Sequence, residues 1–568
     1  MPYNGVYEAV ADQHDPDRGW EEHAHVGDET SLNVATEALG RHGDSNRPGL
    51  RIRDFETGET ELYTFAELDA AANRVANYLC DHTDRGDRIG AMAPTRLELY
   101  AVVFGTIKAG RIYLPLAPVF GPDALNYRLE DSGASVLFTT DRGCEIADGD
   151  LPSLERVVRI GDDSGDGSAN VDAIGNGTAT NDGNAADDTD SVVDGDTIVD
   201  DYDAVRTRPE TFETVETHPN DPYTLTYTSG TTGQPKGVLS AHRGPIELYA
   251  YTEYVVDLRP DDVYLVAASP SWSYGLTMGT IMSGIRGTAI GCYRGQFDPH
   301  AFFETLAEWD VDNAMIPPTA LRQSRAAGID LEAYDIDLRV LISAGESLDR
   351  ETVDWCEDGL GAPPQDAYGL TEAGMVVCNY AFDDWEVKPG SMGKVTPGVE
   401  VALLDDDGTR VERGEVGEIA IERDEDARGS YWGRPEATLE SFTGRWLRTG
   451  DLARQDEDGY FWYVSRADNV IVSAGHRIGP EEVEATLLDH PSVEEAAVVG
   501  KPDETRGEIV AAFVTLVGDY EPSDSLADEL RQFAREELSK HEYPRNVSFL
   551  EELPKTASGK IKRSVLLE

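Results

Sequence analysis

The strongest constraint on the fold is a repeated change from strand-like to helix-like patterning along the chain. The stretch LRIRDFETGETELYT, from Leu50, predicts a β-hairpin, and a helix follows in which Thr64 and Glu67 fit a capping box. RIGAMAP predicts a buried strand, and a second capping box, Thr95 to Glu98, opens the next helix before the strand RIYLPLAP. This alternation predicts an α/β fold, in which helices cover both faces of parallel or mixed sheets.

Two changes in composition divide the chain. Residues 161–205 consist mainly of Asp, Gly, Asn, Ser and Thr, which predicts an acidic low-complexity insertion and not a domain. The pattern changes again near Gln455, where short strand and helix signals begin. We therefore expect a large N-terminal α/β domain over residues 1–457, a hinge at Asp458, and a small mobile C-terminal α+β domain over residues 459–568.

The charge balance excludes some partners. The chain has 48 Lys and Arg against 108 Asp and Glu, a formal net charge of −60. Such a field repels nucleic acid and anionic membrane surfaces. In molar salt the Debye length falls to about 3 Å, so the self-repulsion is screened. Because the charge is spread along the chain, we expect a protein of a salt-rich cytoplasm and not an acidic interaction protein.

Neither the cysteines nor the N-terminus indicates an exported or membrane protein. The five cysteines form no CxxC pattern, so neither a disulfide framework nor a zinc site is expected. The first residues show no basic and apolar leader, and no apolar run is long enough to cross a bilayer. We expect a cytoplasmic protein without membrane insertion, and the oligomeric state stays open.

The stretch PYTLTYTSGTTGQPKGV predicts a strand that ends in an anion-binding loop. Its glycines permit close backbone approach, and its amides and hydroxyl groups can surround an anion on several sides. Lys236 adds a point charge in a chain with few lysines. A polyphosphate suits this loop. It does not fit the Walker A pattern, because Pro235 precedes the lysine and Gly237 follows it.

The loop resembles the phosphate-binding signature of the AMP-forming acyl-CoA synthetases, members of the adenylate-forming superfamily. Further stretches that resemble signatures of this family follow in the family's order, and they are ISAGESL, DAYGLTEAG, WLRTGDLA, SRADNVIVSAGHRIGPEEVE and PKTASGKIKR. The stretch KPGSMGKVTPG narrows the likeness to medium-chain and related acyl- or aryl-CoA synthetases. Several motifs in a fixed order are far more specific than one.

The resemblance implies an ATP-dependent ligase that joins a carboxylic acid to AMP, releases pyrophosphate and passes the acyl group to coenzyme A. It implies catalytic roles for Lys560, Glu372 and Lys236, and Mg²⁺ binding by Glu372 and Thr232. Asp451 would accept the ribose hydroxyl groups. The implied ATP- or AMP-binding residues are Thr228, Ser229, Gly230, Thr231, Thr232, Gly233, Lys236, Gly345, Glu346, Ser347, Asp366, Ala367, Tyr368, Gly369, Thr371, Asp451, Arg466 and Lys560.

The same resemblance places coenzyme A and the acid. The loop lining the pantetheine tunnel would be Ser473, Ala474, Gly475, His476 and Arg477. Many members carry a lysine inside the interdomain hinge loop, and this chain has Val472 or its neighbours in that stretch instead.

The acid would lie among Trp272, Tyr274, Gly275 and Gly369, although Trp272 could equally be a core residue. Acetate-specific relatives carry a tryptophan in place of Gly369, so we expect open space there and a medium-chain, branched or aromatic acid.

Two other functions stay open at this point. The enzyme could deliver its acyl group to a carrier-protein thiol instead of coenzyme A, although no carrier domain is evident. The chain could also be a nucleotide-binding regulator without turnover. The joint presence of Lys236, Glu372, Asp451, Arg466 and Lys560 argues against the regulator.

The charge of the chain predicts salt-dependent folding. Dialysis from molar KCl into dilute buffer should remove screening and unfold or inactivate the protein, because about 10 Å of Debye length at 0.1 M leaves the carboxylates repelling one another. Circular dichroism and activity measured across the salt series test this. Full activity with an intact fold in dilute buffer would contradict the prediction.

Overall fold

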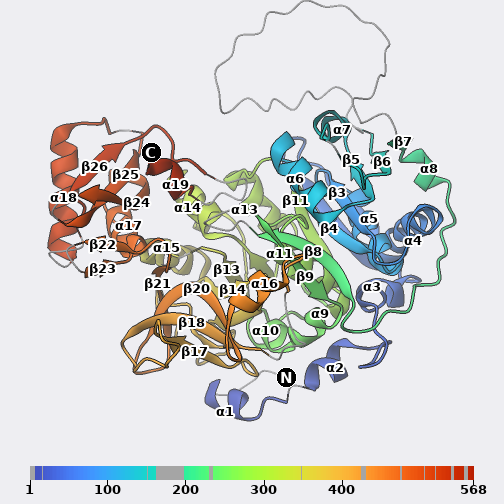
Figure 1. The fold of residues 1–568 in the computed structure, drawn as a ribbon, viewed down its shortest axis with the longest axis horizontal. Helices are drawn as coiled ribbons and strands as arrows, with labels where there is room; N and C mark the ends of the chain where they lie inside the picture. The colour runs from blue at the N-terminus through green and yellow to red at the C-terminus, as the bar shows by residue number, and fades with distance from the viewer. Residues whose placement is uncertain are drawn as a thin grey trace, which may run out of the picture.

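The computed structural model confirms the α/β class, with a large N-terminal part of mixed sheets and a smaller C-terminal part. It describes residues 7–15, 17–149, 151–161, 197–228, 234–346, 348–423, 430–473, 476–503, 506–518, 520–538, 543–555 and 561–567. Figure 1 shows β22 to β26 as a lobe on the left, away from β3 to β7 on the right.

A nine-stranded sheet forms the centre of the large part, and parallel pairs join β1, β11, β10, β12, β13 and β14. The outer strands β2, β15 and β16 pair antiparallel. In spatial order the strands are β16 (Lys394–Val395), β15 (Gly374–Cys378), β14 (Gln365–Leu370), β13 (Val340–Ala344), β12 (Asn313–Met315), β10 (Val263–Val266), β11 (Ala289–Arg294), β1 (Pro48–Asp54) and β2 (Thr60–Thr64).

A seven-stranded sheet lies beside it, parallel except for its last pair. Its short central strands β3, β4 and β5 are buried almost throughout, as expected for a sheet covered on both faces. In spatial order they are β7 (Ile198–Asp201), β6 (Arg156–Arg159), β5 (Val136–Thr139), β3 (Arg88–Met92), β4 (Ile112–Pro115), β8 (Pro222–Thr228) and β9 (Lys236–Ala241).

Two five-stranded sheets complete the chain. The first contains β17 (Val401–Leu404), β18 (Val416–Glu422), β20 (Trp446–Gln455), β19 (Phe442–Thr443) and β21 (Phe461–Arg466). The second, the C-terminal sheet, contains β23 (His476–Ile478), β22 (Ile471–Ser473), β25 (Gly507–Leu516), β24 (Val493–Asp503) and β26 (Asn546–Phe549).

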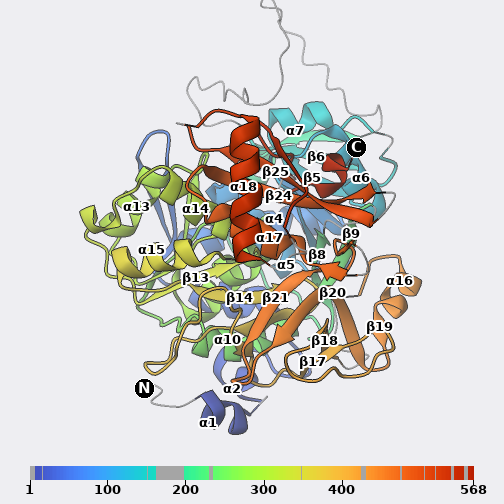
Figure 2. The ribbon, with the colours of Figure 1, turned by 90° about the vertical axis from the view of Figure 1, so that its left-hand side faces the viewer.

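Most of the helices lie around the nine- and seven-stranded sheets (Figures 1 and 2). Those before the glycine-rich loop are α1 (Tyr7–Asp12), α2 (Arg18–His23), α3 (Val34–Ala38), α4 (Phe65–His82), α5 (Leu97–Lys108), α6 (Pro122–Ser132), α7 (Asp141–Ile146) and α8 (Asp203–Arg206). Those after it are α9 (Arg243–Glu247), α10 (Tyr249–Tyr254), α11 (Ser273–Leu276), α12 (Ser283–Arg286), α13 (Pro299–Glu308), α14 (Pro318–Ala326), α15 (Arg350–Leu360), α16 (Pro435–Glu440), α17 (Pro480–Leu488), α18 (Asp524–Glu537) and α19 (Arg563–Leu566).

The first capping box is confirmed and the second is wrong. Thr64 Oγ1 accepts from the backbone N–H of Glu67, and the Glu67 carboxylate accepts from the N–H of Thr64 at 2.8 Å. At the next helix the N-cap is Arg96, which makes no side-chain cap. The Glu98 carboxylate is taken instead by Arg96 at 2.9 Å and by Arg206 at 3.0 Å, so it cannot reach back to the helix start.

The predicted insertion is shorter than expected. Residues 162–196 lie outside the described part of the chain, but β7 and α8 belong to the fold. β7 adds an edge strand beside β6, and Tyr202 and Val205 are buried. Asp200 accepts a hydrogen bond from the hydroxyl of Tyr78, which ties this edge to α4. The low-complexity composition hid a strand whose partners lie far away in the sequence.

The predicted hinge residue lies inside a hairpin. Asp458 is in the turn between β20 and β21, and these strands pair from Asp451 with Arg466 to Gln455 with Phe461. Lys388 also contacts Asp458 at 2.7 Å. Both sides of Asp458 therefore belong to one sheet. The chain passes to the C-terminal sheet only between Arg466 and Ile471. The domain boundary near residue 458 stays a prediction.

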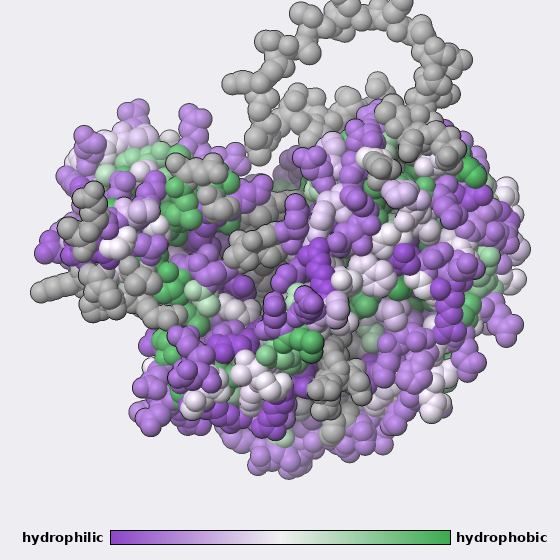
Figure 3. Space-filling model, in the orientation of Figure 1, coloured by the Kyte–Doolittle hydropathy of each residue, from purple (hydrophilic) through white to green (hydrophobic). Residues whose placement is uncertain are grey.

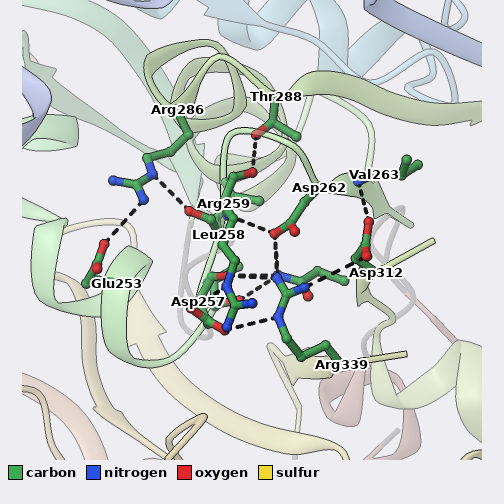
Figure 4. Close-up of polar contacts among 12 residues, drawn as sticks. Glu253, Asp257, Leu258, Arg259, Asp262, Val263, Arg286, Thr288, Asp312 and Arg339 are labelled. Carbon is green, nitrogen blue, oxygen red and sulfur yellow. Dashed lines mark hydrogen bonds and ion pairs between the residues drawn. The ribbon is translucent and has the colours of Figure 1, made fainter. Parts of the chain in front are cut away.

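An ion-pair network joins the starts of three strands of the nine-stranded sheet (Figure 4). Arg339, just before β13, contacts Asp262, just before β10, at 2.6 Å. It also contacts Asp257 at 3.0 Å and Asp312, just before β12, at 3.8 Å. Charged side chains thus hold the amino ends of these strands, and the carboxyl ends are left for other contacts.

The surface agrees with the composition. The face shown in Figure 3 is mostly hydrophilic, with hydrophobic residues scattered in small groups. Among the described helices, none is long and apolar enough to cross a bilayer.

Candidate active site

A cavity of about 2840 Å³ opens at the carboxyl ends of the strands. Thr228 at the end of β8, Ala344 at the end of β13 and Leu370 at the end of β14 all line it. The opposite wall comes from the C-terminal part, through Glu481, Glu484 and Arg563. In open α/β sheets this edge is where ligands bind, because loops and helix starts meet there.

The two ends of the glycine-rich loop meet the Thr-Glu motif. Thr228 pairs with Lys236 across β8 and β9. The Lys236 ammonium lies 4.8 Å from the ring centroid of Tyr431, and the Tyr431 hydroxyl donates to Glu372 at 3.0 Å. A cation, a phenol and a carboxylate therefore share one wall of the cavity. Thr371, which precedes the carboxylate, lines the same wall.

Asp451 is the centre of a second group. One of its carboxylate oxygens accepts from the hydroxyl of Tyr368 at 2.7 Å. The other accepts from the hydroxyl of Tyr463 at 3.3 Å and from Arg466 at 3.2 Å. Arg466 also donates to the carbonyl of Thr449 at 2.9 Å, which fixes its guanidinium beside the carboxylate. The sequence predicted three of these side chains, and the structure brings them into contact.

The predicted adenine segment follows β13 and enters β14. Gly345 has φ +101°, which other residues rarely adopt. Glu346 accepts from Thr319 at 2.7 Å and from Arg322 at 2.6 Å. Asp366 is buried, and this burial raises the pKa of its carboxyl group to about 7. Ala367 beside it is also buried, and both residues line the cavity.

Some of the predicted site residues lie outside the part of the chain that the structure describes. They are Ser229, Gly230, Thr231, Thr232, Gly233, Ser347, Ala474, Gly475 and Lys560. For His476 and Arg477 the structure describes the backbone, which forms β23 and pairs with β22. Ser473 is buried at the end of β22, where it pairs with Gly507. The described ends of the predicted coenzyme A loop therefore lie at the edge of the C-terminal sheet, where β22 and β23 pair.

The predicted acid pocket is placed only in part. Trp272 lines the cavity and is 38% exposed, so it is not a core residue. Tyr274 also lines it, and its hydroxyl lies 2.9 Å from that of Tyr251. Gly275 is not among the lining residues, because it packs on backbone: a Cβ there would lie 2.2 Å from the carbonyl oxygen of Ser269. Its role is structural.

Gly369 lines the cavity, but the expected free space beside it is wrong. A Cβ at this position would lie 2.4 Å from the carbonyl oxygen of Gly374 and 2.7 Å from Sδ of Met375. The β14 and β15 strands shift register between Tyr368 and Gly369, which brings β15 close. The glycine is therefore required by a close strand approach, and Met375 fills the space that a larger side chain would take.

The C-terminal wall carries a buried charge group that the sequence did not reveal. Arg563 donates to both carboxylate oxygens of Glu484, at 2.8 and 2.7 Å, and lies 3.4 Å from Glu481. Burial raises the pKa of Glu481, and its Oε2 has no hydrogen-bond partner within the described structure. Tyr431 and Tyr463 were also missed. A tyrosine next to a motif gives no signal until the fold places its hydroxyl.

The described side chains of the cavity can bind one magnesium ion only if substrate phosphate oxygens supply further ligands. Among the described residues, no group of three His, Cys, Asp or Glu side chains could hold a metal by itself. Mg²⁺ at nucleotide sites usually takes one or two carboxylates, with water and substrate phosphates completing the shell. Glu372, on the cavity wall beside Lys236, fits that role. Thr232, the other predicted ligand, is not described.

Comparison with known proteins covers most of the chain. Residues 43–432 match the model of the AMP-binding enzyme family, and residues 482–560 match that of the AMP-binding enzyme C-terminal domain. An acetyl-coenzyme A synthetase of Bacillus subtilis is 36% identical over 547 residues, which are 94% of this chain and 90% of that protein.

Solved structures show the same likeness. An acyl-CoA synthetase of Brucella canis superposes with a TM-score of 0.72 at 34% identity, covering 99% of this chain and 98% of that one. An anthranilate CoA ligase in complex with anthranoyl-AMP superposes with a TM-score of 0.79 at 29% identity, covering 94% and 97%.

The group around Asp451 predicts a defect in nucleotide binding when its charge is removed. Asp451→Asn should raise the KM for ATP about 10- to 100-fold, because a hydrogen bond to a charged group contributes about 1.5–3 kcal/mol. The KM for the acid should change little. Steady-state kinetics on the purified variant give both numbers.

Tyr463→Phe is the matched control, since it removes only the 3.3 Å contact to the same carboxylate and should change the KM for ATP less. An unchanged KM for ATP in Asp451→Asn, with an unchanged unfolding temperature, would show that the carboxylate does not face the nucleotide.

Proposed function

The chain belongs to the AMP-binding enzyme family, and we propose that it is an AMP-forming acyl-CoA synthetase. It activates a carboxylic acid with ATP to an acyl-AMP, releases pyrophosphate, and transfers the acyl group to coenzyme A. The observation that carries the proposal is the pair of groups on one cavity wall, Lys236 with Tyr431 and Glu372, and Asp451 with Tyr368 and Arg466.

The first half-reaction must bring a carboxylate next to a polyphosphate. Charge repulsion and positioning therefore make up much of its barrier. Lys236 supplies positive charge at the mouth of the glycine-rich loop. Glu372 would hold Mg²⁺, which would offset the charge of the phosphate oxygens. The Tyr431 hydroxyl orients the Glu372 carboxylate through the 3.0 Å contact.

Asp451 would fix the nucleotide. Its carboxylate is held by Tyr368 from β14 and by Arg466 from β21, so it is oriented before ATP arrives. The ribose hydroxyl groups would donate to the same carboxylate, and the adenine would lie against Gly345, Asp366 and Tyr368. A preset carboxylate avoids the cost of ordering a side chain on binding.

The second half-reaction would use the C-terminal part. We propose that coenzyme A binds at Ser473 to Arg477, which would line the pantetheine tunnel after the C-terminal part turns. A turn at Asp458 would break the pairing of β20 with β21. We therefore place the joint at residues 467–470, the link between β21 and the C-terminal sheet.

A locked hairpin tests the position of this joint. Arg454 and Trp462 face each other across β20 and β21, so Arg454→Cys with Trp462→Cys can form a disulfide. With the joint at 467–470, the oxidised protein keeps both half-reactions at the rates of its reduced form. Loss of thioester formation on oxidation, recovered on reduction, would put the joint inside the hairpin.

The acid is proposed to be medium-chain, branched or aromatic. Leu248, Tyr251, Met278 and Met375 line the same cavity as Trp272 and offer an apolar wall to an acyl group. Met375 narrows the space beside Gly369, so the pocket is not open at that position. The ratio of kcat/KM for octanoate to kcat/KM for acetate distinguishes a medium-chain acid from a short acid as the substrate. A ratio below one would favour short acids.

The setting is proposed to be a salt-rich cytoplasm. The net charge of −60 and the hydrophilic surface support it, because both are tolerated when salt screens the carboxylates.

Lys560 is proposed to neutralise charge that develops between the acyl oxygen and the α-phosphate. Lys560→Ala should reduce acyl-adenylate formation about 10²- to 10³-fold, the usual cost of losing one such donor. Thioester formation from a supplied acyl-adenylate should be spared. Pyrophosphate release and thioester formation, measured separately, check this.

Lys501→Ala is the matched control, since Lys501 is also in the C-terminal part but does not line the cavity among the described residues. Equal loss of both half-reactions in Lys560→Ala would contradict the division of labour.

A further inference from the structure

The first helices of the chain lie against the cleft, although they precede the matched family region, which begins at residue 43. His14, Asp17 and Trp20 line the large cavity. Figures 1 and 2 both place α1 and α2 at the foot of the molecule, with α2 next to α10. We call the described residues 7–15 and 17–23 the leader.

One end of the leader is anchored on the segment that follows β15. The Tyr7 hydroxyl donates to the carbonyl of Val395 at 2.8 Å, and its ring lies 5.2 Å from that of Tyr380. Glu8 pairs with Lys394 at 3.1 Å, and the same ammonium lies 5.0 Å from the Tyr7 ring. Aromatic packing, a hydrogen bond and an ion pair therefore fix α1 in one position.

The other end is anchored on α9 and α10. Gly19 lies so close to α9 that a Cβ would come within 2.4 Å of the carbonyl oxygen of Ile246. His23 is fully buried against the ring of Tyr249, and Trp20 packs on the main core. Only a glycine permits this approach, so the sequence of α2 fits its docking site.

Between these anchors, His14 lies on the segment that backs the acid side of the cleft. Nε2 of His14 would be 2.5 Å from a Cβ on Gly398, which has φ +85°. Two residues earlier, Thr396 donates to the carbonyl of Met375 at 3.1 Å. Sδ of Met375 in turn fills the space beside Gly369. A continuous path of contacts thus runs from the leader to the predicted acyl pocket.

The chemistry of this wall suits an uncharged acyl chain. Burial lowers the pKa of His14, so its imidazole is neutral near pH 7. Its Nδ1 is buried and makes no hydrogen bond in the described structure. Leu248, whose Cδ2 lies 3.2 Å from a Cβ position on Gly374, continues the same wall. Asp17 and Glu29, both exposed at the rim, would repel a second carboxylate on the acid.

We propose that His14 and Asp17 of the leader close the acid-binding side of the cleft, and that His14 limits the length of the monocarboxylic acid. The inference rests on the proposed acyl-CoA synthetase function and adds a specificity-determining segment that lies before the matched family region. His14 acts by occupying space and makes no contribution to the chemical step.

Two substitutions of opposite size test this. The measurement is kcat/KM for straight-chain acids from two to ten carbons, by pyrophosphate release in molar KCl. His14→Ala opens the wall, so acids one or two methylenes longer than the best wild-type acid should gain at least about 10-fold relative to it, the usual scale for one methylene. His14→Phe should shift the preference toward shorter acids.

Gln13→Ala is the matched control, because Gln13 is the exposed neighbour of His14 and does not line the cavity within the described chain. It should keep the wild-type profile. In all three variants the KM for ATP and the unfolding temperature should stay unchanged.

An active enzyme whose acid profile is the same in His14→Ala, His14→Phe and Gln13→Ala would overturn the inference and leave the proposed function intact. A change in profile that appears equally in Gln13→Ala would also overturn it. A wild-type protein that releases no pyrophosphate with any acid would overturn the proposed function, and the inference with it. If His14→Ala does not fold, the direction of the shift in His14→Phe decides.

Discussion

The carboxylate of Asp451 is the contact on which the arrangement of the cleft depends. It accepts hydrogen bonds from β14 through Tyr368 and from β21 through Tyr463 and Arg466. The nine-stranded sheet and the β17–β21 sheet therefore meet at one side chain, and that side chain lines the cavity. Holding a charged group with three donors lowers the cost of its burial, and it sets the geometry before a ligand arrives.

The net negative charge of the protein opposes the binding of anionic ligands in the cleft. A chain with a net charge of −60 has to bind ATP, coenzyme A and an acid, which are all anions. The cavity wall provides positive charge close to the ligands. The basic residues that line it include Lys236, Arg322, Arg466, Lys562 and Arg563. Salt would screen the distant carboxylates, while cations in contact with a ligand are screened much less.

Sequence patterns predicted elements where local rules decide them. The capping box at Thr64 and the strand β3 are local, and both appear as expected. The helix start at Arg96 was missed because one partner of the Glu98 carboxylate, Arg206, is 108 positions away in the chain. Motifs placed Lys236, Glu372 and Asp451 on one cavity. Tyr431, Met375 and His14 could not be predicted, since each reaches the site through packing between distant segments.

The central claim is that this cleft transfers an acyl group to coenzyme A through an acyl-AMP. The most direct measurement is acid-dependent AMP release in molar KCl with ATP and Mg²⁺, with and without coenzyme A, across acids from acetate through octanoate to benzoate. The account predicts AMP formation that requires coenzyme A and is fastest with one class of acid. Pyrophosphate release that coenzyme A leaves unchanged would contradict it and favour a carrier-protein thiol as acceptor.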